Sequence, residues 1–181
     1  MSAPQNIIAV VFDFDDTLTN DSTTALLRSA GIDANDFWSV QASRLIEKGW
    51  DPTPAYLKLI LDNVGPRKAF GKLTNEKLRE FGATLNFYPG LPGLFKDLKE
   101  SARQHTLSNP VVEFYIISGG LVEVIRGSSV FKHLSGAWGC EFAEDDGHIA
   151  HIKRLVSFTE KTKYLYTINK GLVEASGPYA V

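Results

Sequence analysis

The sequence predicts an α/β fold in which a Rossmann-like parallel sheet carries an inserted, all-helical segment. Two apolar runs, residues 7–13 and 111–117, are rich in β-branched and aromatic residues and hardly alternate with polar ones. Such runs are typical of parallel strands that are covered on both faces. About a hundred residues separate the two runs, whereas a simple right-handed crossover needs roughly thirty. The excess predicts an insertion between the strands.

We expect three helices in this insertion. The first is capped by Asn35 or Asp36 and ends before Gly49, the second covers residues 52–64, and the third is capped by Thr74. Each carries apolar residues at helical spacing, so that one face is apolar. The insertion is therefore predicted to be wholly helical.

The chain is expected to return to the sheet domain through another amphipathic helix. Apolar residues recur at i, i+3, i+4 and i+7 between Leu91 and Leu98, and this face should pack on the second strand. We therefore predict that residues 1–20 and 88–181 form the Rossmann-like core. Residues 21–87 are predicted to form a helical cap.

The remaining elements alternate as an α/β fold requires. Residues 137–142 are expected to form a third strand, and the Asp-Asp-Gly-His sequence at 145–148 is typical of a hairpin turn. Residues 149–158 should return along it. Thr159 is then expected to cap a helix over residues 160–169.

Composition excludes several classes of function. The chain has 181 residues and a formal net charge of −2, which gives no basic footprint for nucleic acid or for a membrane surface. The single cysteine, Cys140, rules out an internal disulfide. There is no apolar run of about 18 residues and no secretory signal at the start. A cytoplasmic location is the expectation.

A cluster of acids follows the first predicted strand. Asp13 is expected to be the last residue of that strand, and ligands of open α/β sheets bind at the carboxyl ends of strands. Asp15 should point to the same side, while Phe14 points away. Two neighbouring carboxylates are costly unless a cation neutralises them or one keeps a proton. Their oxygens suit Mg²⁺.

Paired acids of this kind can perform phosphoryl transfer. One Asp can attack phosphorus and form an aspartyl-phosphate. The other, with its pKa raised by its neighbour, can protonate the leaving group and later activate water. The alternative is a plain turn and helix cap, since Asp and Thr favour such positions. A cap needs one Asp, however, and here three stand within four positions.

Three segments carry a resemblance to the haloacid dehalogenase superfamily. "FDFDDTLT" resembles its first motif at Asp13, Asp15 and Thr17, and "FYIISGG" resembles the second, which ends in Ser118. "FTEKTKYL" resembles the third, with Lys161 as the motif lysine. Lys163 is the rival for that role, and Ser118 could instead cap the helix that begins at Leu121. The helical insertion resembles the cap of phosphoserine-phosphatase-like members.

The resemblance implies a Mg²⁺-dependent phosphomonoesterase that acts on a small phosphorylated metabolite. Asp13 would be the nucleophile and Asp15 the general acid and base, and both would serve the metal. The residues implied in catalysis are Asp13, Asp15, Ser118 and Lys161, and those implied in phosphate binding are Asp13, Thr17, Ser118, Gly119 and Lys161.

The family's fourth motif, a strand ending in acidic residues, has no counterpart after Lys161. We therefore expect a C-terminally truncated member whose core is incomplete. The first strand would then have an exposed edge, through which the chain could self-associate. The alternative function is an inactive domain of the same fold that binds phosphate or a partner.

Overall fold

The computed structural model describes residues 6–105 and 110–173. Within them, a mixed four-stranded sheet has the order β1-β2-β3-β4. The first three strands are parallel and β4 runs antiparallel to β3. The strands are β1 (Ile7–Phe12), β2 (Val111–Leu121), β3 (Gly136–Asp145) and β4 (His148–Arg154). This arrangement confirms the predicted α/β fold and the hairpin.

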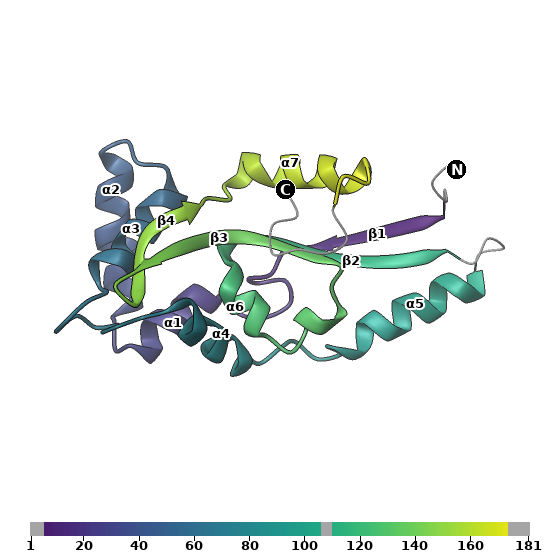
Figure 1. Cartoon of the computed structure of the whole chain (residues 1–181), viewed down its shortest axis with the longest axis horizontal. Helices are drawn as coiled ribbons and strands as arrows, with labels where there is room; N and C mark the ends of the chain where they lie inside the picture. Colours follow the sequence, from purple (N-terminus) through teal and green to yellow (C-terminus); the bar gives the residue numbers. More distant parts are fainter. Residues whose placement is uncertain (1–5, 106–109, 174–181) are drawn as a thin grey trace.

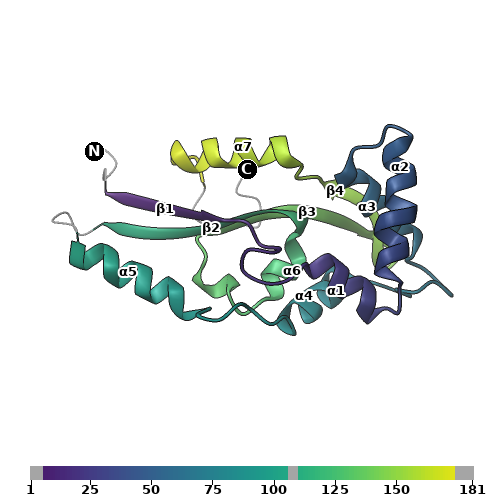
Figure 2. The ribbon, with the colours of Figure 1, turned by 180° about the vertical axis from the view of Figure 1, so that it is seen from behind.

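Helices surround the sheet. They are α1 (Ser22–Ser29), the π-helix η1 (Asp36–Ala42), α2 (Ser43–Glu47), α3 (Pro52–Asp62), α4 (Asn75–Ala83), α5 (Gly93–His105), α6 (Val122–Gly127), the 3-10 turn η2 (Phe131–His133) and α7 (Phe158–Asn169). Figures 1 and 2 show α7 on one face of the sheet and α5 and α6 on the other. The helices before α5 gather around the β3–β4 hairpin.

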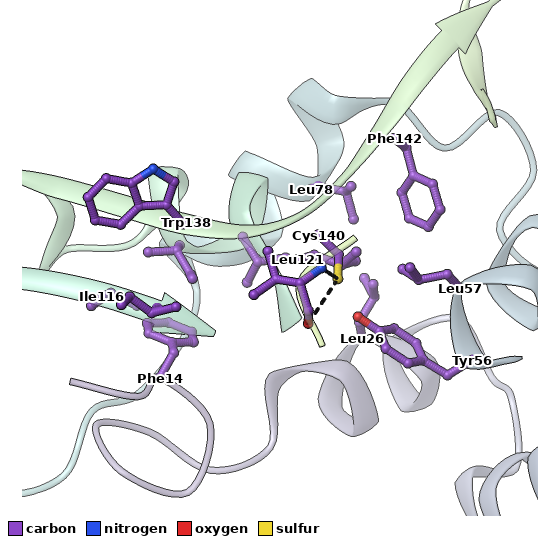
Figure 3. Packing of buried hydrophobic residues seen from close by; sticks show 14 of the residues in the cluster. Phe14, Leu26, Tyr56, Leu57, Leu78, Ile116, Leu121, Trp138, Cys140 and Phe142 are labelled. Atoms are coloured by element: carbon purple, nitrogen blue, oxygen red, sulfur yellow. Dashed lines mark hydrogen bonds between the residues drawn. The ribbon is translucent and has the colours of Figure 1, made fainter. Parts of the chain in front are cut away.

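The core fills the space between the sheet and its helices. Phe95 of α5 packs edge-on against Phe114 of β2, with ring centroids 5.0 Å apart, so the returning helix lies on the second strand as predicted. On the other face, Tyr164 of α7 stacks on Trp138 of β3 at 5.2 Å. Figure 3 shows the buried side chains between β3 and the first helices.

The first strand differs from its prediction. It was expected to be covered on both faces and to end at Asp13, but Ile7 and Ile8 are 47% and 41% exposed and the strand ends at Phe12. Within the described residues, β1 lies at the edge of the sheet and pairs only with β2. An edge strand leaves part of its apolar surface uncovered. The prediction of full burial was therefore wrong for the start of this strand.

Helix caps were predicted with mixed success. Thr74 caps α4, since its hydroxyl accepts the Lys77 amide at 3.1 Å. Neither Asn35 nor Asp36 caps the next helix, because Asp33 Oδ1 accepts both of their amides, at 2.8 and 3.1 Å. The side chain that starts this helix therefore lies two to three residues earlier than expected.

Two further predictions differ from the structure: the number of helices in the insertion and the start of the last helix. Four α-helices and the π-helix lie between residues 21 and 87, where three helices were expected. The additional one, α1, is capped by Asp21, which accepts the Thr24 amide at 3.0 Å. Thr159 lies inside α7, which already begins at Phe158, so it is not the cap. The division into core and cap stays a prediction.

Helix α4, which lies before the return to β2, packs tightly against α6, which follows β2. Helices α4 and α6 cross so closely that a Cβ at Gly82 would lie 2.0 Å from the Val124 carbonyl oxygen, and one at Gly127 1.9 Å from that of Arg79. Buried Glu123 of α6 also pairs with Arg79 of α4. These contacts place α4 directly against the helix that follows β2.

No helix in the described part of the chain is long and apolar enough to cross a lipid bilayer.

Candidate active site

The acidic cluster lies in a tight turn at the carboxyl end of β1. Phe14 is 1% exposed and packs edge-on against Phe87, with ring centroids 6.0 Å apart. Its carbonyl oxygen accepts the Leu18 amide at 2.9 Å, which closes the turn. Asp16 adopts a left-handed backbone with φ of +56°, a conformation that Asp tolerates better than most residues. Phe14 is thus turned into the core between the two acids, of which Asp13 is exposed and Asp15 is partly buried.

Asp13 contacts a lysine from the far end of the chain. Lys161 Nζ lies 2.6 Å from Asp13 Oδ2, and Asp13 Oδ1 accepts the Phe14 amide at 2.8 Å. The Asp13 side chain is 45% exposed, so a ligand can reach it. The rival lysine, Lys163, lies 3.7 Å from Glu160 instead. Of the two lysines, the structure brings Lys161 to the acidic turn.

Asp15 lies deeper than Asp13. Its Oδ1 accepts the amide of Ser22, the first residue of α1, at 2.7 Å, and its Oδ2 lies 3.4 Å from Ser118 Oγ. Burial raises the pKa of the Asp15 carboxyl, and the hydrogen bond from Ser22 only partly opposes this. Nearby Asp13 and Asp21 raise the pKa further. The two acids of the turn therefore differ, one paired and accessible, the other buried and biased toward the protonated form.

Ser118 lies within strand β2 and is 1% exposed. The β2–β3 register shifts between Ile117 and Leu121, and such irregularities redirect side chains near functional sites. Ser118 Oγ accepts the Gly120 amide at 2.9 Å. Helix α6 begins only at Val122 and has no side-chain cap. The alternative in which Ser118 caps that helix is therefore wrong.

Gly120 lets the second strand approach Asp15. A Cβ at this position would lie 2.6 Å from Asp15 Oδ2 and 3.2 Å from Ser118 Oγ. The first distance is shorter than real Cβ contacts allow. A glycine here permits the two strand ends to meet.

The other two residues that were predicted to bind phosphate are Thr17 and Gly119. Thr17 is exposed and lines a cavity of about 280 Å³ with Tyr88 and Leu94. Gly119 presents its carbonyl oxygen to the interior, where it accepts the hydroxyl of Tyr56 at 2.6 Å and the thiol of Cys140 at 3.3 Å. A role of Thr17 and Gly119 in phosphate binding stays a prediction.

Sequence reasoning missed three groups around the site. Ser22 could have been suspected from the Asp-Ser start of a helix. The sequence pattern gave no sign of a polar role for Tyr56, which shares a helix face with apolar residues. It gave none for Cys140 either, which has the pattern of any buried strand residue. Their roles depend on contacts with segments distant in the sequence.

The oxygen donors of the site match what Mg²⁺ requires. Mg²⁺ at phosphate-handling sites is commonly held by one or two carboxylates, with waters and the substrate completing its shell. The Asp13 carboxylate and the backbone carbonyl oxygen of Asp15 could supply two such oxygen ligands, which leaves the Asp15 side chain for proton transfer. Across residues 6–105 and 110–173, no group of three or more His, Cys, Asp or Glu side chains is placed to hold a metal.

Comparison with known proteins places the chain among its relatives. No protein-family model matches the sequence. An uncharacterized protein from Borreliella burgdorferi is 30% identical over 196 aligned positions, which cover 96% of this chain and 68% of the relative.

Solved structures show the same architecture. A haloacid dehalogenase-family hydrolase from Salmonella enterica serovar Typhi superposes with a TM-score of 0.67 at 17% identity, covering 94% of this chain and 53% of that one. A phosphoserine phosphatase, solved as an analogue of its phospho-aspartyl intermediate, superposes with a TM-score of 0.63 at 17% identity. The match covers 92% of this chain and 72% of that one. The chain thus spans about half the length of the first neighbour.

These likenesses show the fold alone: the chain shares the fold of a haloacid dehalogenase-family hydrolase and of a phosphoserine phosphatase. Within this fold class, the chain belongs to the same family as the uncharacterized Borreliella burgdorferi protein.

Proposed function

We propose that this chain is a Mg²⁺-dependent phosphomonoesterase that works through an aspartyl-phosphate on Asp13. The observation that carries the proposal is the asymmetry of the two acids. Asp13 is accessible and paired with Lys161 at 2.6 Å, while Asp15 is partly buried with a raised pKa. A nucleophile must be ionised and accessible, and a general acid must hold a proton near neutral pH. The arrangement supports this division of roles.

In the first step, an Asp13 carboxylate oxygen attacks the phosphorus atom. The new O–P bond forms as the bond between phosphorus and the ester oxygen breaks, and Asp15 gives its proton to the departing oxygen. The Lys161 ammonium attracts the phosphoryl group and offsets the repulsion between that group and the Asp13 carboxylate.

In the second step, Asp15 acts as a base. It takes a proton from a water molecule whose oxygen attacks phosphorus, the bond to Asp13 breaks, and phosphate leaves with both acids in their starting forms. The Ser22 amide holds one Asp15 oxygen throughout. The Ser118 hydroxyl, beside the other oxygen, keeps the carboxyl oriented.

The Asp13 carboxylate and the Asp15 backbone carbonyl oxygen would hold Mg²⁺, whose charge would offset the negative charge that gathers on the phosphoryl oxygens in the transition state. For the substrate we propose a small phosphorylated metabolite, since two acids in a narrow turn leave room for a monoester and the structural neighbours include phosphoserine phosphatases. We also propose a cytoplasmic location, which suits the free, buried thiol of Cys140.

The test is hydrolysis of p-nitrophenyl phosphate by the full chain, with Mg²⁺ or with EDTA. We expect Mg²⁺-dependent turnover in the wild type and none above background in Asp13→Asn. Lys161→Met should lose on the order of 10²-fold in kcat/KM, as expected for removing a group that stabilises transition-state charge. Lys163→Met serves as the matched control and should keep wild-type activity.

Two outcomes would contradict the proposal. Turnover that survives Asp13→Asn would remove the nucleophile from the scheme. A wild-type chain that binds orthovanadate at the Asp13–Lys161 contact but releases no phosphate would favour the alternative, a phosphate-binding domain without catalysis.

A further inference from the structure

One peptide group beside the site is held at both ends. The carbonyl oxygen of Gly119 and the amide of Gly120 belong to the same peptide unit, and they point in opposite directions because the unit is planar and trans. The carbonyl accepts the Tyr56 hydroxyl at 2.6 Å, and the amide donates to Ser118 Oγ at 2.9 Å. Fixing one end of this peptide therefore fixes the direction of the other.

The hydrogen bond from the Gly120 amide determines which hydrogen bond the Ser118 hydroxyl can still donate. A hydroxyl that accepts one hydrogen bond from an amide still has its own proton to donate. Asp15 Oδ2 lies 3.4 Å from Ser118 Oγ. The hydrogen bonds thus run in one direction, from the Tyr56 hydroxyl through the peptide and Ser118 to Asp15. Such chains polarise each member in turn.

The carbonyl end is anchored by the helical insertion. Tyr56 lies on α3, 63 residues before Gly119, and is 7% exposed. Its ring packs against Trp38 of η1, with centroids 5.8 Å apart, and the Trp38 indole donates to Thr24 of α1 at 2.8 Å. Figure 3 shows the Tyr56 hydroxyl directed from its helix toward Cys140. The hydroxyl is therefore positioned by three segments of the insertion.

The donors at the carbonyl keep their protons over the working range of pH. Burial raises the pKa of Tyr56 well above its usual value, and burial also raises the pKa of the Cys140 thiol. The thiol is the weaker donor and lies farther away, at 3.3 Å. The Val156 amide donates to its sulfur at 3.3 Å, which holds it in place. Tyr56 is thus the main anchor of the Gly119 carbonyl.

We propose that Tyr56 is a positioning residue for the general acid and base. Its hydroxyl holds the Gly119–Gly120 peptide so that Ser118 donates to Asp15, and it thereby links the helical insertion to the reactive carboxyl. Its effect on turnover rests on the proposed function, whereas its effect on the peptide does not. A purely structural tyrosine would stabilise the fold without altering Asp15.

The first test measures kcat and KM for p-nitrophenyl phosphate. Tyr56→Phe removes only the hydroxyl, and we expect kcat to fall about tenfold, the equivalent of one hydrogen bond, with KM within about twofold. Tyr115→Phe is the matched control, since the Tyr115 hydroxyl makes a bond of the same length, 2.6 Å, to Glu113. It should leave both constants unchanged.

A double-mutant cycle separates positioning from general loss of stability. In a Ser118→Ala background, Tyr56→Phe should have little further effect on kcat, because the relay is already broken. The same tenfold loss in both backgrounds would overturn the proposal, and so would a Tyr56→Phe variant whose kcat stays within about twofold of the wild type.

A second readout does not depend on turnover. Hydrogen exchange of the Gly120 amide, compared with the earlier amides of β2, should speed up at least about tenfold in Tyr56→Phe and stay within about twofold in Tyr115→Phe. If the wild type hydrolyses nothing, the proposed function fails and this measurement alone decides the role of Tyr56. An unchanged Gly120 exchange rate would overturn it.

Discussion

Replacing Gly120 with alanine should disable the site while leaving the fold intact. The new Cβ would lie 2.6 Å from Asp15 Oδ2, and ordinary contacts begin at about 3.4 Å. The carboxylate oxygen would have to move by roughly 0.8 Å, yet the Ser22 amide holds its other oxygen at 2.7 Å. The strain therefore falls on the orientation of the acid and on the backbone of the turn.

The size of the effect follows from the geometry of proton transfer. A general acid must lie within about 2.6–3.2 Å of its partner, and a displacement near 1 Å costs on the order of 10²-fold. We expect kcat for p-nitrophenyl phosphate to fall about a hundredfold, with a modest change in KM. Overpacking should cost about 1–3 kcal/mol in the free energy of unfolding, which thermal denaturation would measure.

Two other glycines provide controls. A Cβ added at Gly93, which lies at the start of α5, would meet no heavy atom within 4 Å, so Gly93→Ala should keep full activity. Gly119→Ala adds a Cβ whose one contact is ordinary, 3.7 Å from the Val156 carbonyl oxygen, so its loss should be at least about tenfold smaller than that of Gly120→Ala. A Gly120→Ala enzyme that retains more than about a third of wild-type kcat would refute the reasoning.

Three further predictions follow from burial, packing and the sheet edge. Burial raises the pKa of Asp15 above its usual 3.8, so its ionisation costs stability as pH rises above 3.8 and the cost persists at higher pH. Asp15→Asn should therefore raise the melting temperature at pH 7, and this gain should shrink as the pH approaches 3.8. A variant that melts lower than the wild type at pH 7 would contradict this prediction. Gly82→Ala should lower the melting temperature by several degrees, because its Cβ would lie 2.0 Å from a backbone oxygen of α6. Calorimetry would measure this loss, and an unchanged melting temperature would show that α4 can shift away from α6. If the half-exposed start of β1 pairs between copies, light scattering should find a dimer that Ile8→Lys converts to a monomer; a monomeric wild type would remove that expectation.

Local patterns predicted the elements of the fold. The apolar runs around Val10 and Phe114 indicated the two parallel strands, and the spacing from Leu91 to Leu98 indicated the helix that packs on them. These signals depend on neighbours a few residues away, which determine helical or extended backbone. The same signals misplaced helix caps and the extent of β1 burial. Competing side chains such as Asp33 and the position of a strand in the sheet are not visible in local periodicity.

The site was predictable only in part. An apolar strand running into Asp13 and Asp15 was enough to place the acids at the carboxyl end of the sheet, because strand direction fixes that end. The sequence could not choose between Lys161 and Lys163, since both lie near the start of one helix. The packing of α7 on the sheet brings Lys161 into contact with Asp13, although the two residues are 148 positions apart in the sequence.

The sequence by itself determined an α/β chain with an acidic turn after its first strand and a helical insertion between its strands. The tertiary structure decided how unequal the two acids are, since burial and the approach of Ser22 and Gly120 set the environment of Asp15. It also revealed the contact of Tyr56 with the peptide beside Ser118. The physical reason is that pKa values and hydrogen-bond direction depend on groups brought together in space, whereas strand and helix patterns depend on groups adjacent in the chain.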